Sequence, residues 1–264
     1  MSRVDKIISF DISSDFGMFK KPDVNNVYFT FNIIPKPALL GILGAVIGLS
    51  GYNQMKESDA YPEFYTELQN LPIGILPYGN KGVFQKRIIK YNNTVGYANK
   101  DGGTLNIMEQ TLIEPKYKIY IGLDLSKKSH KKLNEFIDKK VVQYEYIPYM
   151  GKNEFRLDID EVKPLEKDKD FKAFVPNDEF AIFSLFPNIN NKALKNNEAL
   201  RDPFDSSMSK SYFYYFERLP IGLDKLNQYK YESFAYTNAK MVSDSEFVKS
   251  LNLFLVDEKV ICLY

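Results

Sequence analysis

Cysteine and histidine are each present only once among the 264 residues, as Cys262 and His130. A single cysteine excludes an internal disulfide bond and is consistent with a reducing compartment. One cysteine and one histidine also cannot supply the nitrogen and sulfur ligands of a typical zinc site. The nucleotide-binding patterns GxxxxGK[ST] and GxGxxG are absent as well. We therefore expect neither a metal centre nor a cofactor.

The chain also lacks a long hydrophobic run. Its longest apolar stretch, residues 38–49, has 12 residues, whereas a membrane-spanning helix needs about 20. Its first residues, MSRVDKIISFDISSDF, do not have the long uncharged core of a secretory signal. These features predict a soluble, cytoplasmic protein without a membrane partner.

Neither sign of charge is in large excess, because 35 Lys and Arg residues are matched by 34 Asp and Glu residues. A free-standing nucleic-acid-binding protein usually has a larger positive excess. Nucleic-acid binding by this chain would therefore need a local patch or membership of an assembly. Tryptophan is absent, but 20 Phe and 19 Tyr residues supply rings for a core, an interface or stacking on bases.

Strand and helix patterns follow one another in the first 165 residues. Apolar residues at every second position indicate strands, and a proline-opened apolar run and a capped amphipathic segment indicate helices. The strands are expected at residues 3–12, 71–77, 116–122 and 156–162, and the helices from Pro35 and Pro37 onwards and from Ser126 through Leu133, Phe136 and Ile137. The resulting order, βαββαβ, is the ferredoxin-like pattern of RRM domains. We therefore predict an α+β fold with an RRM-like domain at residues 1–165.

Residues 79–112 interrupt this pattern with a polar, basic and glycine-rich segment. The sequence Asp101-Gly102-Gly103 is a hairpin turn signal, and the flanking segments contain few apolar residues. We therefore predict a protruding β-hairpin, which we call the thumb.

The remaining residues, 166–264, are predicted to form a β-rich C-terminal extension. Extended segments are expected at residues 180–187, 229–237 and 251–264, the last with a turn at Asp257-Glu258. A polar insertion is expected at residues 188–203, and the aromatic run at 212–216 is typical of a core or a subunit interface.

Four glycines recur in the first predicted helix. At 100° per residue, Gly41, Gly44, Gly48 and Gly51 fall within an arc of about 80° and leave a stripe without side chains. One interpretation is close packing of the helix on a sheet, with Gly48 and Gly51 ending the helix. Another is that the N-terminal half of the helix faces a nucleic-acid backbone, because free N–H groups favour phosphate. Both can hold at different ends.

The segment PKPALLGILGAVIGLSGY, residues 35–52, resembles the signature of CRISPR-associated RAMP family five. Its members cap the 5′ handle of the guide RNA (crRNA) in type I Cascade complexes. ISFDIS with the following DFGMFKKP resembles the family's opening strand and Phe–Lys–Pro loop, and residues 79–112 stand where members carry a thumb. EPKYKIYIGLD and PYMGKNEF resemble a later core strand and a glycine turn. The similarity covers most of residues 1–165, is weak afterwards, and is greatest to the type I-B branch.

The resemblance implies a non-catalytic RNA-binding subunit in antiviral defence. Its partners would be crRNA, the Cascade backbone RAMP subunit and the large subunit, and indirectly the target DNA and the helicase-nuclease. Single-stranded RNA is held by cations along the phosphates and by rings under the bases. The candidate RNA-binding residues are Lys20, Lys21, Lys36, Gly41, Gly44, Lys86, Arg87, Lys90, Tyr149, Gly151, Lys152 and Asn153. The thumb cations could also be solvated or contact a protein neighbour.

Two alternatives remain. A type I-C relative implies metal-independent cleavage of precursor crRNA, which needs a base for the 2′-OH and an acid for the leaving oxygen. Tyr52, Lys128 and His130 are the candidates, although nothing in the sequence places Tyr52 beside His130. The lysines around His130 are typical of a solvated helix face, so we expect His130 to be a surface residue. The second alternative is a purely structural subunit whose glycine helix packs on a partner.

Overall fold

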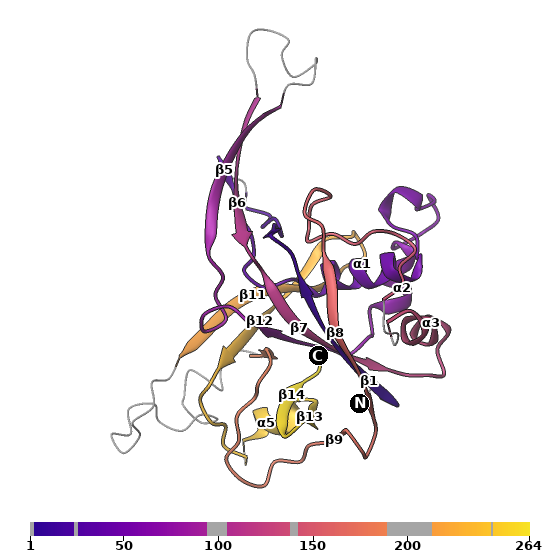
Figure 1. Cartoon of the computed structure of the whole chain (residues 1–264), viewed down its shortest axis with the longest axis vertical. Coiled ribbons are helices and arrows are strands. Elements are labelled where there is room, and N and C mark those ends of the chain that lie inside the picture. Colours follow the sequence, from indigo (N-terminus) through magenta and orange to yellow (C-terminus); the bar gives the residue numbers. More distant parts are fainter. Residues whose placement is uncertain (1–2, 24–25, 94–104, 138–141, 189–212, 244) are drawn as a thin grey trace.

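The computed structural model describes residues 3–23, 26–93, 105–137, 142–188, 213–243 and 245–264 (Figure 1). Strands predominate and helices are few, as predicted for an α+β fold. No helix among these residues is long and apolar enough to cross a membrane.

The central sheet has four antiparallel strands in the order β4-β7-β1-β8. These are β1 (Lys6–Ser13), β4 (Ile73–Pro77), β7 (Lys116–Leu123) and β8 (Asp158–Glu166). The predicted alternation is confirmed, since Phe10 of β1 lies opposite Ile119 of β7 and both are fully buried. Strand β8 continues to Glu166, beyond the predicted residue 162.

The second face of the sheet is covered by C-terminal strands. Strands β9 (Phe171–Ala173), β13 (Leu253–Val256) and β14 (Lys259–Cys262) form a sheet of order β14-β13-β9. Ile7 of β1 packs in one cluster with Phe254 and Ile261 of this sheet. The predicted turn is confirmed: Asp257 and Glu258 both have positive φ, 46° and 63°, as a two-residue hairpin requires.

Three helices, α1 (Lys36–Ile47), α2 (Glu63–Leu68) and α3 (Lys128–Ile137), lie together on one side of the molecule (Figure 1). A 3₁₀ turn, η1 (Tyr52–Gln54), follows α1, and a separate short helix, α5 (Glu246–Ser250), lies beside the C-terminal strands. Ser126 does not cap α3 as predicted, because its hydroxyl donates to Asp124 Oδ1 at 2.6 Å. Helix α3 begins two residues later, and Leu133 and Ile137 point into the core.

The glycine stripe of α1 is shorter than predicted. Gly48 ends the helix in the left-handed region with φ 76°, as expected, but Gly51 lies outside the helix. A Cβ at Gly44 would lie 2.5 Å from Cβ of Phe64, and one at Gly41 would approach only the Phe64 ring, at 3.9 Å. Gly44 therefore allows α1 and α2 to pack closely, so the predicted close packing is helix on helix at this point.

The thumb consists of β5 (Lys86–Asn93) and β6 (Leu105–Ile113), which pair antiparallel and project from the rest of the molecule (Figure 1). Its predicted turn at 101–103 lies outside the described residues. Two short strands also pair with β6: β2 (Phe16–Gly17) at its base and β3 (Val27–Tyr28) near its middle. Phe84, which precedes β5, is buried against Tyr117 and belongs to the core.

An ion-pair cluster holds the thumb against the turn that precedes β8. Glu109 of β6 is only 4% exposed, and its Oε1 lies 2.6 Å from Lys152 Nζ. Tyr91 of β5 donates its hydroxyl to Glu109 Oε2 at 3.2 Å, and Glu154 also pairs with Lys152, at 2.7 Å. Burial alone would lower the pKa of Lys152, but the hydrogen bonds to Glu109 and Glu154 outweigh it and raise the pKa. The ammonium group of Lys152 is therefore paired with carboxylates of the protein itself.

The C-terminal residues share a core with the first 165. Strands β10 (Phe186–Pro187), β11 (Tyr214–Leu223) and β12 (Tyr229–Thr237) form a sheet of order β10-β12-β11, and the strand predicted at 229–237 is confirmed. Leu219 and Phe234 belong to the same buried cluster as α1. Residues 189–203 of the predicted polar insertion lie outside the described residues.

Lys36, at the start of α1, connects the helix to the last residue of the sequence. It is 9% exposed, and its Nζ donates to the backbone oxygen of Tyr264 at 2.8 Å. Burial lowers its pKa to about 8. Lys36 is therefore a buried structural residue, and the expectation of a cation facing RNA at this position is corrected.

The Gly44 contact predicts opposite effects of two alanine substitutions in α1. Gly44→Ala should lower the free energy of unfolding by up to about 2 kcal/mol, because overpacking costs ~1–3 kcal/mol and the gain in helix propensity offsets only ~1 kcal/mol of that cost. Gly41→Ala, the matched control, should raise it by up to about 1 kcal/mol. Urea denaturation measures both, and equal stability of the two variants would refute the packing role of Gly44.

The thumb cluster predicts that Lys152→Met is strongly destabilising. The substitution leaves the buried Glu109 carboxylate without its cation, which costs about 3–5 kcal/mol. Adding Glu109→Gln should recover most of that loss. The control is Lys163→Met, which breaks an exposed ion pair with Asp257 and should cost less than about 1 kcal/mol. Similar losses for the two lysines in denaturant unfolding would contradict this assignment.

Burial of Lys36 predicts that the difference in stability between the parent protein and Lys36→Met depends on pH. Below pH 8, Lys36 is charged in the folded and unfolded states, and the folded state carries the full cost of burying that charge. Between pH 8 and 10.5 the folded state loses its proton first, so the stability associated with Lys36 rises by about 3 kcal/mol. The advantage of Lys36→Met over the parent protein should therefore be largest below pH 8 and shrink up to pH 10.5. A difference that is constant across this window in thermal unfolding would contradict the prediction.

Candidate functional site

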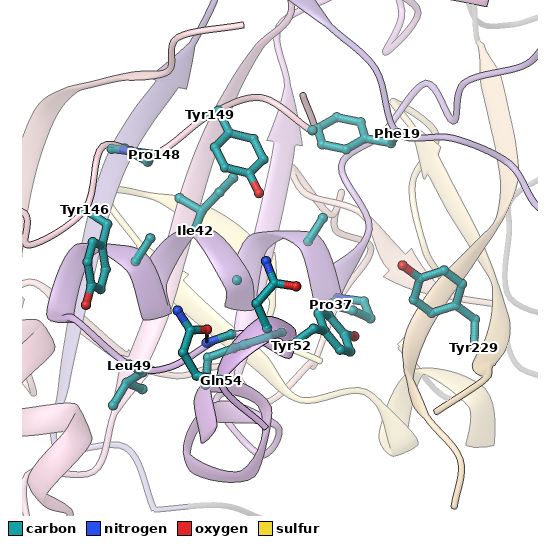
Figure 2. Close-up of a pocket in the computed structure, with 17 residues that line it drawn as sticks. Phe19, Pro37, Ile42, Leu49, Tyr52, Gln54, Tyr146, Pro148, Tyr149 and Tyr229 are labelled. Carbon is teal, nitrogen blue, oxygen red and sulfur yellow. Dashed lines mark hydrogen bonds between the residues drawn. The ribbon is translucent and has the colours of Figure 1, made fainter. Parts of the chain in front are cut away.

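A groove of about 610 Å³ lies along α1 (Figure 2). In Figure 2, Tyr146 and Tyr149 lie along one edge, Tyr52 and Gln54 along the opposite edge, and Tyr229 beyond the end near Pro37. The lining residues are Phe19, Pro37, Ala38, Gly41, Ile42, Ala45, Leu49, Gly51, Tyr52, Asn53, Gln54, Phe64, Tyr146, Pro148, Tyr149, Gly151 and Tyr229.

Small residues on one face of α1 make the floor of the groove. Ala38, Gly41 and Ala45 follow one another at spacings of three and four residues, which places them on the same side of a helix. Gly41 has no side chain to fill the space above it. A flat molecule can therefore approach the α1 backbone at this position.

Tyrosines from separate segments form the rim. Tyr52, Tyr146, Tyr149 and Tyr229 are between 44% and 58% exposed, which is high for large aromatic residues lining one groove. The Tyr52 ring meets the Phe64 ring edge-on, with centroids 5.9 Å apart. Half-exposed rings of this kind are available for stacking on a ligand.

Backbone contacts fix the segment that carries Tyr146 and Tyr149. The N–H groups of Glu145 and Tyr146 donate to the carbonyls of Val46 and Ala45 at 3.0 and 3.1 Å, which satisfies acceptors at the C-terminal end of α1. Further along, Gly151 has φ +87° and lies against the Met18 carbonyl so closely that a Cβ would overlap it. The predicted close backbone approach at Gly151 is thus found, with the protein's own chain as the partner.

Among the residues that the structure describes, no charged side chain lines the groove. Lys20, which follows Phe19 in the chain, is exposed, and its Nζ lies 3.7 Å from the centroid of the Tyr28 ring. Lys230, which follows Tyr229, is also exposed, whereas Lys36 and Lys152, which adjoin Pro37 and Gly151, are engaged in the fold. The described lining of the groove is therefore neutral, and exposed lysines follow two of its residues, Phe19 and Tyr229.

The predicted RNA-binding residues do not form one cluster. Gly41, Tyr149 and Gly151 line the groove, whereas Gly44 is buried and faces Phe64. The structure thus fills the glycine stripe with the protein's own core at Gly44 and leaves it open at Gly41.

The other predicted cations lie on the thumb and the first loop. Lys86, Arg87 and Lys90 are exposed on β5. Lys21 is half-buried, and its Nζ lies 3.6 Å from Glu217 Oε1. Asn153 is exposed on the turn before β8 and does not line the groove.

The candidate catalytic residues lie in different environments. Tyr52 lines the groove, and burial raises the pKa of its hydroxyl. Lys128 is exposed on α3, and neither it nor His130 lines the groove.

His130 is 1% exposed, so the expectation of a surface histidine is wrong. Its Nδ1 accepts the N–H of Asp124 at 3.0 Å, and burial, with Lys127, lowers its pKa. A buried imidazole with one nitrogen used by the backbone is poorly placed to exchange protons with a bound substrate.

The residues of the groove that sequence reasoning missed include Asn53, Gln54, Tyr146 and Tyr229. The run YEYIPY, residues 144–149, was a usable signal, since three of its six residues are tyrosines and it directly precedes the glycine turn. Nothing local connects Tyr229 with α1, because the two are almost two hundred residues apart. Among the residues that the structure describes, no group of three or more His, Cys, Asp and Glu side chains could hold a metal ion.

No protein-family profile and no curated protein sequence matches this chain. Solved structures do. The crystal structure of a CRISPR protein from Archaeoglobus fulgidus is similar with a TM-score of 0.50 and 11% identity, over 98% of each chain. A chain of a CRISPR RNA-guided surveillance complex has a TM-score of 0.46 and 10% identity, over 89% of this chain and 90% of that one. A chain of a type III-B Cmr-beta complex bound to cognate target RNA and AMPPnP has a TM-score of 0.46 and 12% identity, over 92% and 88%. Over nearly its whole length, the chain shares the fold of the CRISPR protein from Archaeoglobus fulgidus.

Proposed function

We propose that this chain is a non-catalytic, RNA-binding subunit of a CRISPR RNA-guided complex and that it holds the 5′ handle of crRNA. The observation that carries the proposal is the neutral, tyrosine-rimmed groove on α1, the helix whose sequence resembles the family five signature. The shared fold with a CRISPR protein supports it. Exposed rings beside exposed cations are what single-stranded RNA binding requires.

The order of elements supports the finer assignment to a RAMP domain. Along the chain the central elements run β1-α1-β4-β7-α3-β8, and in the sheet the strands lie in the order β4-β7-β1-β8. We propose that this is the ferredoxin-like βαββαβ arrangement, with the thumb inserted between β4 and β7. The type I-B assignment rests on the sequence resemblance.

The low net charge of the chain supports a role as one subunit of an assembly. A net charge of +1 provides little long-range attraction for RNA. The exposed thumb cations, Lys86, Arg87 and Lys90, would contribute locally, and the backbone and large subunits would provide the rest. In this proposal the complex acts in antiviral defence and reaches target DNA and the helicase-nuclease only through its other subunits.

The competing function is metal-independent cleavage of precursor crRNA, which the position of Tyr52 in the groove favours. The buried His130 argues against it, because its Nδ1 already accepts a backbone hydrogen bond. Tyr52 is also a poor base, since burial raises its pKa further above neutrality. We therefore propose binding without cleavage.

Purification of the tagged chain with its associated subunits from its own cells tests this function. The bound RNA should be short and share a common 5′ end, and that end should be protected from nuclease in the complex. Repeat RNA incubated with the isolated chain in EDTA should stay intact with the parent protein and with Tyr52→Phe, which removes only a hydroxyl.

Two outcomes would contradict the proposal. Cleavage by the parent protein that is lost in Tyr52→Phe would establish the endoribonuclease instead. A complex whose RNA 5′ end is digested freely while the subunits stay associated would indicate a purely structural subunit.

A further inference from the structure

We infer that the groove beside α1 is a subsite for unpaired nucleobases, and that the sugar–phosphate backbone of the bound RNA stays outside it, near Lys20. The inference rests on the proposed function and names the part of the RNA that enters the groove. It differs from the sequence-based interpretation, in which the start of α1 faces phosphate.

The charge of the groove favours a neutral occupant. The 17 lining residues in the described part of the chain are all uncharged. Moving a phosphate into such a site without a cation would be costly, because a buried charge needs a partner. The start of α1 supplies no free cation, since Lys36 Nζ donates to the backbone oxygen of Tyr264, and Pro37 contributes no N–H there. Bases are uncharged at neutral pH, so they match the lining and phosphates do not.

The rim and floor favour a flat occupant. Tyr52, Tyr149 and Tyr229 present half-exposed rings from three separate segments, and Gly41 leaves the floor open. The groove volume of about 610 Å³ falls within the range of small-ligand sites, about 300–1,000 Å³. Stacking of a base on an aromatic side chain contributes about 1–3 kcal/mol.

Two carboxamides give the groove hydrogen-bonding capacity. Asn53 and Gln54 line the groove from η1. The N–H of Gly51 donates to Gln54 Oε1 at 3.0 Å, which orients this carboxamide and leaves its nitrogen as a donor. Carboxamides can pair with the edges of bases, whereas an aliphatic side chain of a protein partner would leave them unsatisfied. A base is therefore the occupant that the lining favours over a partner's apolar side chain.

Lys20, the exposed lysine in the first loop, provides outside the groove the positive charge that the lining lacks. Lys20 follows Phe19, which lines the groove, and Lys20 itself does not. Its ammonium group remains exposed above Tyr28, where a phosphate between two bases could be neutralised. Stacking and charge would thus be contributed by different residues, and the dependence of binding on salt concentration distinguishes the two contributions.

The experiment measures binding of 5′-handle RNA by the assembled complex across a range of salt concentrations. Tyr149→Ala should weaken binding about 5- to 100-fold without changing the slope of log Kd against log salt. Lys20→Ala should reduce that slope by about one. The matched control is Tyr144→Ala, since Tyr144 is 46% exposed in the same segment but does not line the groove.

An abasic walk along the RNA identifies the base. Removal of one base should cost the parent complex as much as Tyr149→Ala does and should cost the Tyr149→Ala complex nothing further. Abasic positions that are all neutral, or losses that simply add to that of Tyr149→Ala, would overturn the inference while leaving RNA binding, and so the proposed function, intact.

A second measurement keeps the inference testable if the complex binds no RNA, the result that would refute the proposed function. Adenosine, cytidine, guanosine and uridine are each titrated into 3-fluorotyrosine-labelled protein. Their binding should shift the fluorine NMR signals of Tyr52 and Tyr149, inorganic phosphate should not, and Ala45→Leu, which fills the groove, should abolish the shifts. Absence of shifts with every nucleoside, or shifts produced only by peptides of a partner subunit, would overturn the inference.

Discussion

The contact between Gly44 and Phe64 is the constraint on which the rest of the structure depends. Only a glycine lets α2 approach α1 this closely, and the approach covers one part of the glycine stripe while Gly41 remains open to the groove. The segment that carries Tyr146 then bonds to the carbonyls at the end of α1. Helix α1 therefore packs against α2 and the segment that carries Tyr146, and the groove lies on the side that these contacts leave open.

The cations of the chain divide into those that build the fold and those that remain exposed. Lys36 and Lys152 are buried or paired and hold α1 and the thumb in place. Lys20, Lys86 and Arg87 stay exposed. Under the proposed function, the cations that stay exposed beside the groove and on the thumb would contact RNA locally, and further attraction for RNA would come from neighbouring subunits.

Local patterns predicted most strands, the thumb and the end of α1 at Gly48, because alternation, turn residues and glycine caps are encoded within a few positions. The site was predicted only in part. Lys36 and Lys152 were predicted to contact RNA because no local signal shows their partners. Tyr264, the partner of Lys36, is 228 residues away in the sequence, and Glu109, the partner of Lys152, lies on the thumb. Tyr229 reaches the groove from β12, which no local signal could show. Contacts between distant segments decided which of the predicted residues are available for binding.

The central claim is that the leading end of a guide RNA lies with its bases in the groove beside α1. Photo-crosslinking of the assembled complex, with 4-thiouridine placed in turn at each position of the RNA 5′ end, tests it most directly. The account predicts adducts on the groove tyrosines, Tyr52, Tyr149 or Tyr229, from at least one position. Adducts confined to the thumb or to other subunits of the complex would contradict it.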